Sequence, residues 1–192
     1  MLFQVDEAQR RKAKSPHELA MVNLLLFNLP MLIALLAGSF VQKDSPLADY
    51  KVIGVLVPLF ISLGVVAFTF MKARKTASTE PWFVASHWKL ATGRYKILLI
   101  AYLVGAVLIG LGWLLSQAQS DPRMQELMFI ALQRVAIAPI LISLMVLIML
   151  ESGSLYQAGR GEVPDALTKR FPPPPDLVRA DPMSSSATEA AG

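Results

Sequence analysis

Cysteine is absent from the 192-residue sequence, and charged residues are scarce at 17%. Without a thiol, the chain has no means of thiolate catalysis, disulfide exchange or iron–sulfur ligation. Soluble domains usually contain about 25% charged residues. Together with a hydrophobic content of 54%, this shortage of charge excludes an ordinary soluble domain and predicts an integral membrane protein.

Ionisable residues are almost missing from the long apolar segments, which contain Arg134 but no Asp, Glu, His or Lys. Proton-driven exporters, intramembrane aspartyl proteases and haem-binding four-helix cytochromes need acids or histidines inside their helices. A phosphate-binding loop and a GxSxG nucleophile elbow are also missing. The chain is therefore expected to be non-enzymatic and to carry no cofactor or metal.

Four segments are long and apolar enough to cross a bilayer, which takes about 20 helical residues. Each is expected to be an α-helix, because a helix satisfies its backbone hydrogen bonds within lipid. Helix starts are marked by a capping residue followed by proline at Ser15-Pro16, Ser45-Pro46 and Asp121-Pro122. The sequence thus predicts an all-α integral membrane protein with four transmembrane helices, at residues 19–40, 52–71, 97–116 and 127–150.

Lysine and arginine are distributed unevenly between the two sides of the expected bundle. Fourteen lie in the N-terminal segment, the central loop and the tail, whereas Lys43, Lys51 and Arg123 lie in the two short loops. Positive residues are retained in the cytoplasm, so both termini and the central loop are predicted to be cytoplasmic, in a bacterial-type inner membrane. The long first apolar segment and its acidic flank favour a retained anchor over a cleaved signal peptide.

Two extramembrane regions flank the expected transmembrane domain, residues 16–151. Residues 1–15 form a basic N-terminal segment, either a frayed terminus or a stretch lying along the anionic leaflet. Residues 152–192 are rich in glycine, serine and proline, with four consecutive prolines at Pro172–Pro175. This composition predicts a flexible, disordered, Pro-rich cytoplasmic tail. The proline run is either a stiff spacer or a docking motif.

The central loop, residues 72–96, combines aromatic and basic side chains, which commonly gather in the lipid headgroup layer. An interfacial helix that turns near Gly93 is the first expectation, and a helical hairpin projecting into the cytoplasm is the second. Nucleic-acid surfaces have a similar composition, but beside a bilayer a membrane role is expected and no nucleic-acid partner. The expected interfacial anchors are Trp82, Trp88, Lys89, Arg94 and Tyr95.

Arg134 and a few uncharged residues are the polar groups expected inside the membrane. Arg134 either snorkels outward toward Asp44, Asp49 or Glu126, or turns inward. In the second case it joins polar residues at similar depth, and the candidate intramembrane or partner site is Asn28, Ser62, Gln133 and Arg134. Kinks or local widening of the helix are expected at the prolines within the spans, Pro30, Pro58 and Pro139.

His17 and His87 are the two histidines, and both lie outside the spans on the expected cytoplasmic side. A membrane enzyme that uses them is a third functional possibility. However, no HxxxH spacing or nearby carboxylate pair accompanies them in the sequence. Surface or interfacial positions are therefore expected for both rings.

Small residues recur at four-residue spacing in the span 97–116, which permits close approach of another helix. The pairs are Ala101 with Gly105 and Ala106 with Gly110. Together with the lack of catalytic groups, they favour a non-enzymatic accessory, assembly or structural subunit of a larger inner-membrane complex, in contact with other membrane subunits or with copies of itself. The alternative is a small transporter or channel component that acts as a homo-oligomer.

Overall fold

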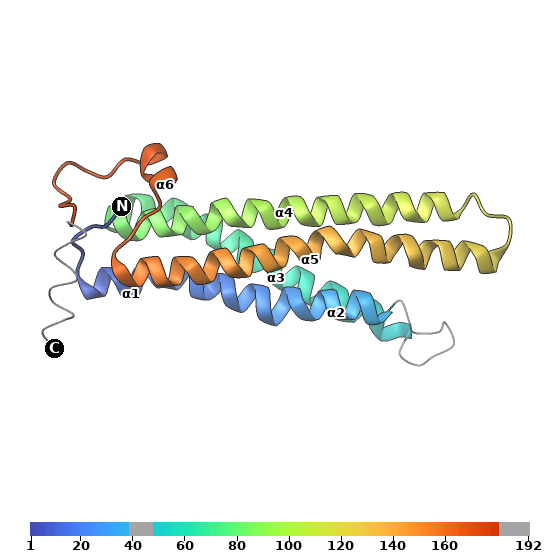
Figure 1. Cartoon of the computed structure of the whole chain (residues 1–192). Coiled ribbons are helices and arrows are strands. Elements are labelled where there is room, and N and C mark those ends of the chain that lie inside the picture. Colours follow the sequence, from blue (N-terminus) through green and yellow to red (C-terminus); the bar gives the residue numbers. More distant parts are fainter. Residues whose placement is uncertain (39–47, 181–192) are drawn as a thin grey trace, which may run out of the picture. The chain divides into compact units, whose positions relative to one another are not determined.

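The computed structural model describes residues 1–38 and 48–180. Its helices are shown in Figure 1: α1 (Glu7–Val22), the π-helical η1 (Asn23–Asn28), α2 (Leu29–Gly38), α3 (Ala48–Thr79), α4 (Trp82–Ser116), α5 (Pro122–Arg160) and α6 (Asp165–Arg170). Since α1, η1 and α2 follow one another directly, the described residues form four helices long and apolar enough to cross a membrane. The expectation of four such helices is confirmed, and the chain is a multi-pass membrane protein.

The first helix begins earlier than its sequence signals suggested. Asp6 Oδ1 accepts a hydrogen bond from the backbone N–H of Gln9 at 2.6 Å, which is the geometry of an N-terminal helix cap. α1 therefore starts at Glu7, and Pro16 lies inside the helix. The start expected at Ser15-Pro16 is wrong, because the earlier Asp6 cap already satisfies the first turn.

The other helix boundaries agree better with the sequence. Asp121 Oδ1 accepts the N–H of Arg123 at 2.9 Å, so the cap and proline expected at the start of α5 are present. α3 and α4 are separated by Glu80 and Pro81, and α4 then runs through Gly93 to Ser116 without a turn. The interfacial helix that turns near Gly93 is therefore wrong, and a helical hairpin is found instead. Ser45-Pro46 lies outside the described residues.

Contacts divide the chain into two compact units. We call the first the polar unit, formed by Met1–Met21, Ala67–Gly93 and Leu150–Gly192. We call the second the apolar unit, formed by Val22–Val66 and Arg94–Met149.

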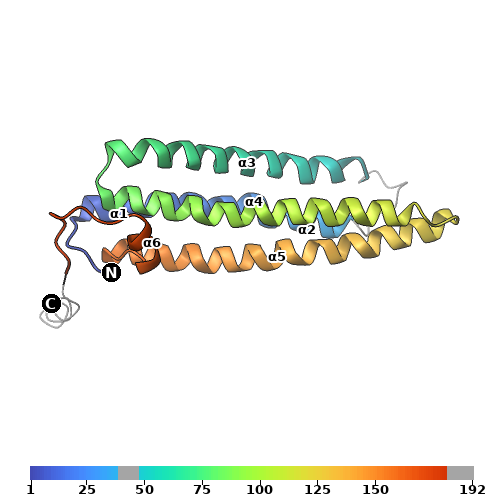
Figure 2. The ribbon, with the colours of Figure 1, turned by 90° about the horizontal axis from the view of Figure 1, so that it is seen from above.

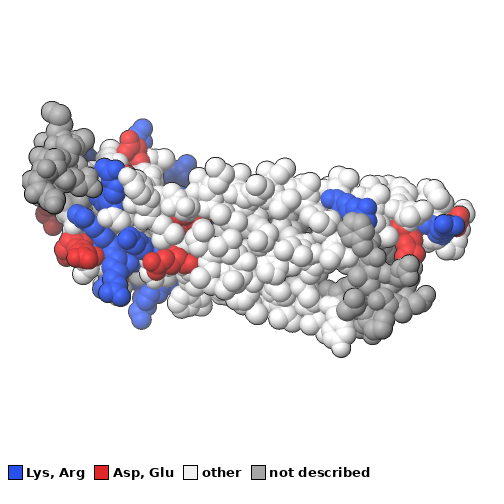
Figure 3. Space-filling view, turned by 60° about the horizontal axis from the view of Figure 1, so that its bottom comes forward, with Lys and Arg blue, Asp and Glu red and all other residues white. Residues whose placement is uncertain are grey.

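The apolar unit is a bundle of four helical segments that run side by side (Figures 1 and 2). Large apolar side chains cover its surface; Phe60, for example, is 67% exposed and Val135 is 68% exposed. Figure 3 shows a broad surface that lacks Lys, Arg, Asp and Glu side chains. An apolar surface of this extent is suited to contact with lipid rather than water.

The polar unit has a small core of its own, into which the N-terminal residues are packed. Phe3 and Val5 are buried together with Phe83, Ala158 and Val163. The backbone of residues 2 and 3 forms antiparallel bridges to residues 162 and 179. The N-terminal segment is thus neither a frayed end nor a stretch lying on lipid, because its apolar side chains are buried within the protein.

The chain after Glu151 also differs from the expected disordered tail. Residues 152–160 continue α5, and residues 165–170 form α6. The Phe171 ring stacks on Trp82 at 5.7 Å between centroids. Composition alone missed this order because the tail packs on residues 1–5 and on α4, which are distant in sequence. Residues 181–192 lie outside the described part of the chain.

Candidate functional site: a buried histidine–glutamate cluster

Three titratable side chains meet inside the polar unit. His17 comes from α1, His87 from α4 and Glu151 from α5. His17 Nδ1 lies 2.6 Å from Glu151 Oε2, and His17 Nε2 lies 2.9 Å from His87 Nδ1. Both histidines are 0% exposed and Glu151 is 2% exposed. The structure therefore contains a fully buried carboxylate–imidazole–imidazole chain, which we call the His–Glu cluster.

Small residues on the same helix faces allow the three helices to approach closely enough to bury these rings. Ala13 and Ala20 lie one turn on either side of His17 and are buried, as is Ala91 one turn after His87. Phe83 packs edge to face on the His87 ring, with 4.8 Å between centroids. The cluster thus has alanine spacers and an aromatic wall rather than water around it.

With Glu151 ionised, the hydrogen-bond chain allows two proton arrangements at His17. If His17 is neutral, its Nδ1–H donates to Glu151 and its Nε2 accepts the Nδ1–H of His87. If His17 is an imidazolium, both of its N–H groups donate, to Glu151 and to His87. In either arrangement the carboxylate fixes the orientation of His17 and supplies the countercharge that a buried imidazolium needs.

Both histidines were expected at a surface or interface, and their complete burial shows that this expectation was wrong. The expected topology contained a signal, since His17 lies two residues before the first expected span and Glu151 directly follows the last. Two chain ends assigned to the same membrane side bring these residues to similar depth. Among the described residues, no group of three or more His, Cys, Asp or Glu is arranged to hold a metal ion.

A second polar cluster lies inside the apolar unit. Asn28 Nδ2 donates to Ser62 Oγ and to the Asn23 carbonyl, both at 2.9 Å. Tyr102 completes the group by hydrogen bonds with Asn28 Oδ1 and Ser62. Asn23 Nδ2 in turn donates to the Tyr95 hydroxyl at 3.3 Å.

The π-helical segment η1 is the local feature that positions this polar cluster. Its wider turn leaves the carbonyl of Asn23 facing the Asn28 side chain five residues later. Pro30 follows two residues on and has no N–H to give to the preceding turn. The irregularity expected near Pro30 is therefore present as a π-helical turn.

The candidate intramembrane site predicted from sequence is only partly assembled. Asn28 and Ser62 are hydrogen-bonded to each other, whereas Gln133 lines a separate cavity. Arg134 is exposed on the surface of α5. Adjacent residues on a helix point about 100° apart, so Gln133 and Arg134 face different surroundings. Of the acids proposed as snorkelling partners, Asp44 lies outside the described residues, and nothing is described of the Asp49 side chain.

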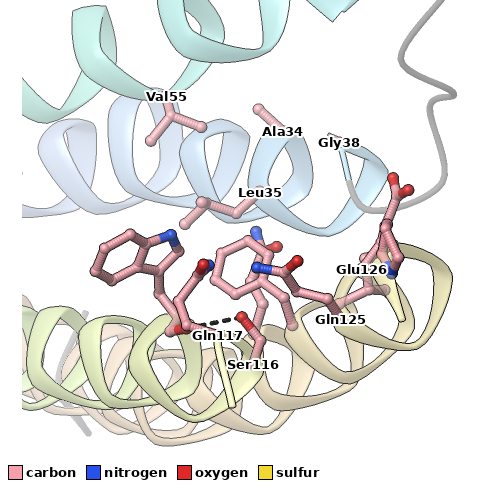
Figure 4. Close-up of a pocket in the computed structure, with 13 residues that line it drawn as sticks. Ala34, Leu35, Gly38, Val55, Ser116, Gln117, Gln125 and Glu126 are labelled. Atoms are coloured by element: carbon pink, nitrogen blue, oxygen red, sulfur yellow. Dashed lines mark hydrogen bonds between the residues drawn. The ribbon is translucent and has the colours of Figure 1, made fainter. Parts of the chain in front are cut away.

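The cavity beside Gln133 has a volume of about 520 Å³ and lies between α2, α3, α4 and α5 of the apolar unit. Ser116, Gln117, Gln125 and Glu126 contribute polar groups to its wall. In Figure 4, Gln125 extends into this space below Leu35. Its size falls within the range of small-molecule sites.

The expected interfacial anchors occupy positions within the protein. Trp88 is 5% exposed and packs with Ala73 and Val84, and Tyr95 is 3% exposed. Arg94 is half-buried. Lys89 Nζ lies 3.2 Å above the centre of the Phe171 ring, and Trp82 packs against Phe3 and Phe171. Trp88 and Tyr95 are therefore core residues rather than headgroup anchors.

The small residues of α4 divide between two faces. Ala101 and Gly105 are buried, and a side chain at Gly105 would collide with Ile140 of α5. Gly112 lies on the same face, where an added Cβ would be 2.9 Å from Leu132 Cβ. Ala106 and Gly110 are exposed instead, and the space beside Gly110 is open.

Comparison with protein-family models gave no match, and comparisons with curated proteins and with solved structures gave none either.

Proposed function

We propose that this chain is a non-enzymatic accessory or assembly subunit of a larger membrane complex, with both termini in the cytoplasm of a bacterial-type cell. The observation that carries the proposal is the exposed Ala106–Gly110 face of α4. The neighbouring small-residue face, with Gly105 and Gly112, is already occupied by α5. The exposed face also consists of small residues, which would allow a helix of another subunit to approach closely.

The burial and the hydrogen bonding of the polar groups support a role without catalysis. The His–Glu cluster is buried, so its rings and carboxylate are not presented to a substrate. Asn28, Ser62 and Tyr102 satisfy one another by hydrogen bonds. Networks of this kind hold helices together in lipid at roughly 1 kcal/mol per contact.

The competing function is a small homo-oligomeric transporter or channel component. The 520 Å³ cavity is the observation that favours it, because amide, hydroxyl and carboxylate groups line the wall within the apolar unit. Copies of one chain arranged around such cavities would form a polar path.

The test is purification of the tagged full-length chain from its native membranes in mild detergent, followed by mass spectrometry. We expect stoichiometric co-purification of unrelated membrane subunits. Gly110→Leu should release them, whereas Gly64→Leu, at another exposed helical glycine with open space beside it, should retain them. A homo-oligomer without other subunits would favour the transporter, and full recovery of partners with Gly110→Leu would contradict the proposed α4 interface.

A further inference from the structure

The polar unit contains a second cavity, of about 710 Å³, that the proposed function does not use. Its wall is formed by residues 2–5, by Arg10 of α1, and by Tyr156 and Arg160 of α5. Two guanidinium-bearing residues therefore line one cavity, although they are 150 positions apart in sequence.

Arg10 shows the clearest sign of a missing ligand. Within the part of the chain that the structure describes, its Nε atom is buried and has no hydrogen-bond acceptor. A buried N–H group of a cation is destabilising when it has no acceptor. An anion in the adjacent cavity would satisfy this atom.

Arg160 is held in place by its own contacts. Its Nη1 donates to the Tyr156 hydroxyl at 2.7 Å, and its Nε lies 3.1 Å from Glu162 Oε1. These contacts fix the guanidinium plane beside the cavity and place a hydroxyl next to it. Arg160 is thus positioned in advance for a ligand that accepts several hydrogen bonds.

Two glycines beside the cavity allow neighbouring parts of the chain to come close to the backbone. Gly161 has a φ of +78°, and a Cβ there would be 2.8 Å from the carbonyl oxygen of Phe3. A Cβ at Gly159 would be 3.3 Å from Lys14 Nζ. The absence of side chains at both glycines leaves room for the N-terminal segment beside Gly161 and for Lys14 beside Gly159.

We infer that this cavity binds an anion of the phosphate-monoester class. Guanidinium groups present planar pairs of N–H donors that match phosphate oxygens, and the two that line the cavity suit a phosphate dianion. The cavity has room for a phosphate group that carries further atoms. A phosphorylated solute and a phosphatidic-acid headgroup share this chemistry.

The test uses the full-length chain in phosphatidylcholine nanodiscs, titrated calorimetrically with inorganic phosphate and with glycerol phosphate. A parallel sample contains phosphatidic acid in the disc. Arg10→Gln should weaken binding at least tenfold, and Arg10→Lys should weaken it less. The matched control is Arg11→Gln, which removes the same charge from an exposed neighbour that does not line the cavity; it should change the dissociation constant by less than twofold.

The outcomes separate the two sources of the anion. Binding of glycerol phosphate in plain discs identifies a soluble ligand. An Arg10-dependent association that requires phosphatidic acid identifies the lipid headgroup. Equal weakening by Arg11→Gln would show diffuse attraction to a basic surface and overturn the inference. Failure of every probe to bind would overturn it as well.

Discussion

Removing the carboxylate of Glu151 is the most informative perturbation of the His–Glu cluster. In Glu151→Ala the His17 ring stays buried while its Nδ1 loses the partner 2.6 Å away. Leaving a buried polar group without its hydrogen-bond partner costs about 1–3 kcal/mol, and more where a charged group takes part. Because domain stabilities are about 5–15 kcal/mol in total, this loss should be large and easily measured.

Glu151→Gln separates the contribution of charge from that of shape. The amide oxygen can still accept the His17 N–H, but the hydrogen bond is no longer charge-assisted. Charge-assisted bonds contribute about 1.5–3 kcal/mol and neutral bonds about 0.5–1.5 kcal/mol. Glu151→Gln should therefore lower the free energy of unfolding by about 1–2 kcal/mol, which is less than the loss in Glu151→Ala.

The assay is reversible unfolding of the full-length chain in mixed micelles, followed by circular dichroism. The control is Glu18→Gln, which neutralises an exposed carboxylate directly after His17 and should stay within about 0.5 kcal/mol of the parent. A double-mutant cycle of Glu151→Ala with His17→Ala should give a coupling energy of about 1–3 kcal/mol. Additive effects, or a Glu151→Ala variant as stable as the control, would refute the view that these groups form one buried unit.

Two further predictions concern packing and topology. Gly112→Ala should lower stability relative to Gly110→Ala by about 1–3 kcal/mol, since the new methyl group meets a backbone-anchored Cβ at the first site and open space at the second. Equal unfolding free energies in micelles would contradict the close α4–α5 contact. Single cysteines at Gln119 and Ser78 should be labelled by an impermeant thiol reagent from the outside and the inside, respectively, as the positive charges predict. The reverse pattern would overturn the orientation.

The presence of four long apolar helices could be predicted from the sequence alone. Length and hydropathy are local properties, so residues 19–40, 52–71, 97–116 and 127–150 were recognisable without knowing their neighbours. The limits of the helices could not be predicted in the same way, because α1, α3, α4 and α5 extend beyond these spans into polar sequence. The Asp121 cap could be predicted, because capping acts within one turn.

Which polar groups meet depends on how each helix is rotated about its own axis. This rotation could not be predicted from the sequence. In a soluble helix an apolar stripe marks the buried face. The helices here are apolar on all sides, and lipid is as apolar as the bundle interior, so periodicity does not separate the two. The sequence could therefore not decide between the two orientations of Arg134; in the structure Asn28 is hydrogen-bonded to Ser62 and Arg134 is exposed.

The burial and the contacts of His17, His87 and Glu151 depend on tertiary packing and could not be predicted from the sequence. The contacts of His17 join it to residues 70 and 134 positions away, and burial at such separations follows from packing rather than from local pattern. The same reason explains why Phe3 and the residues after Glu151 became ordered parts of the polar unit. Each segment alone can bury too little apolar surface to offset the entropy lost on ordering. Packing between distant parts of the chain buries the additional surface that is needed.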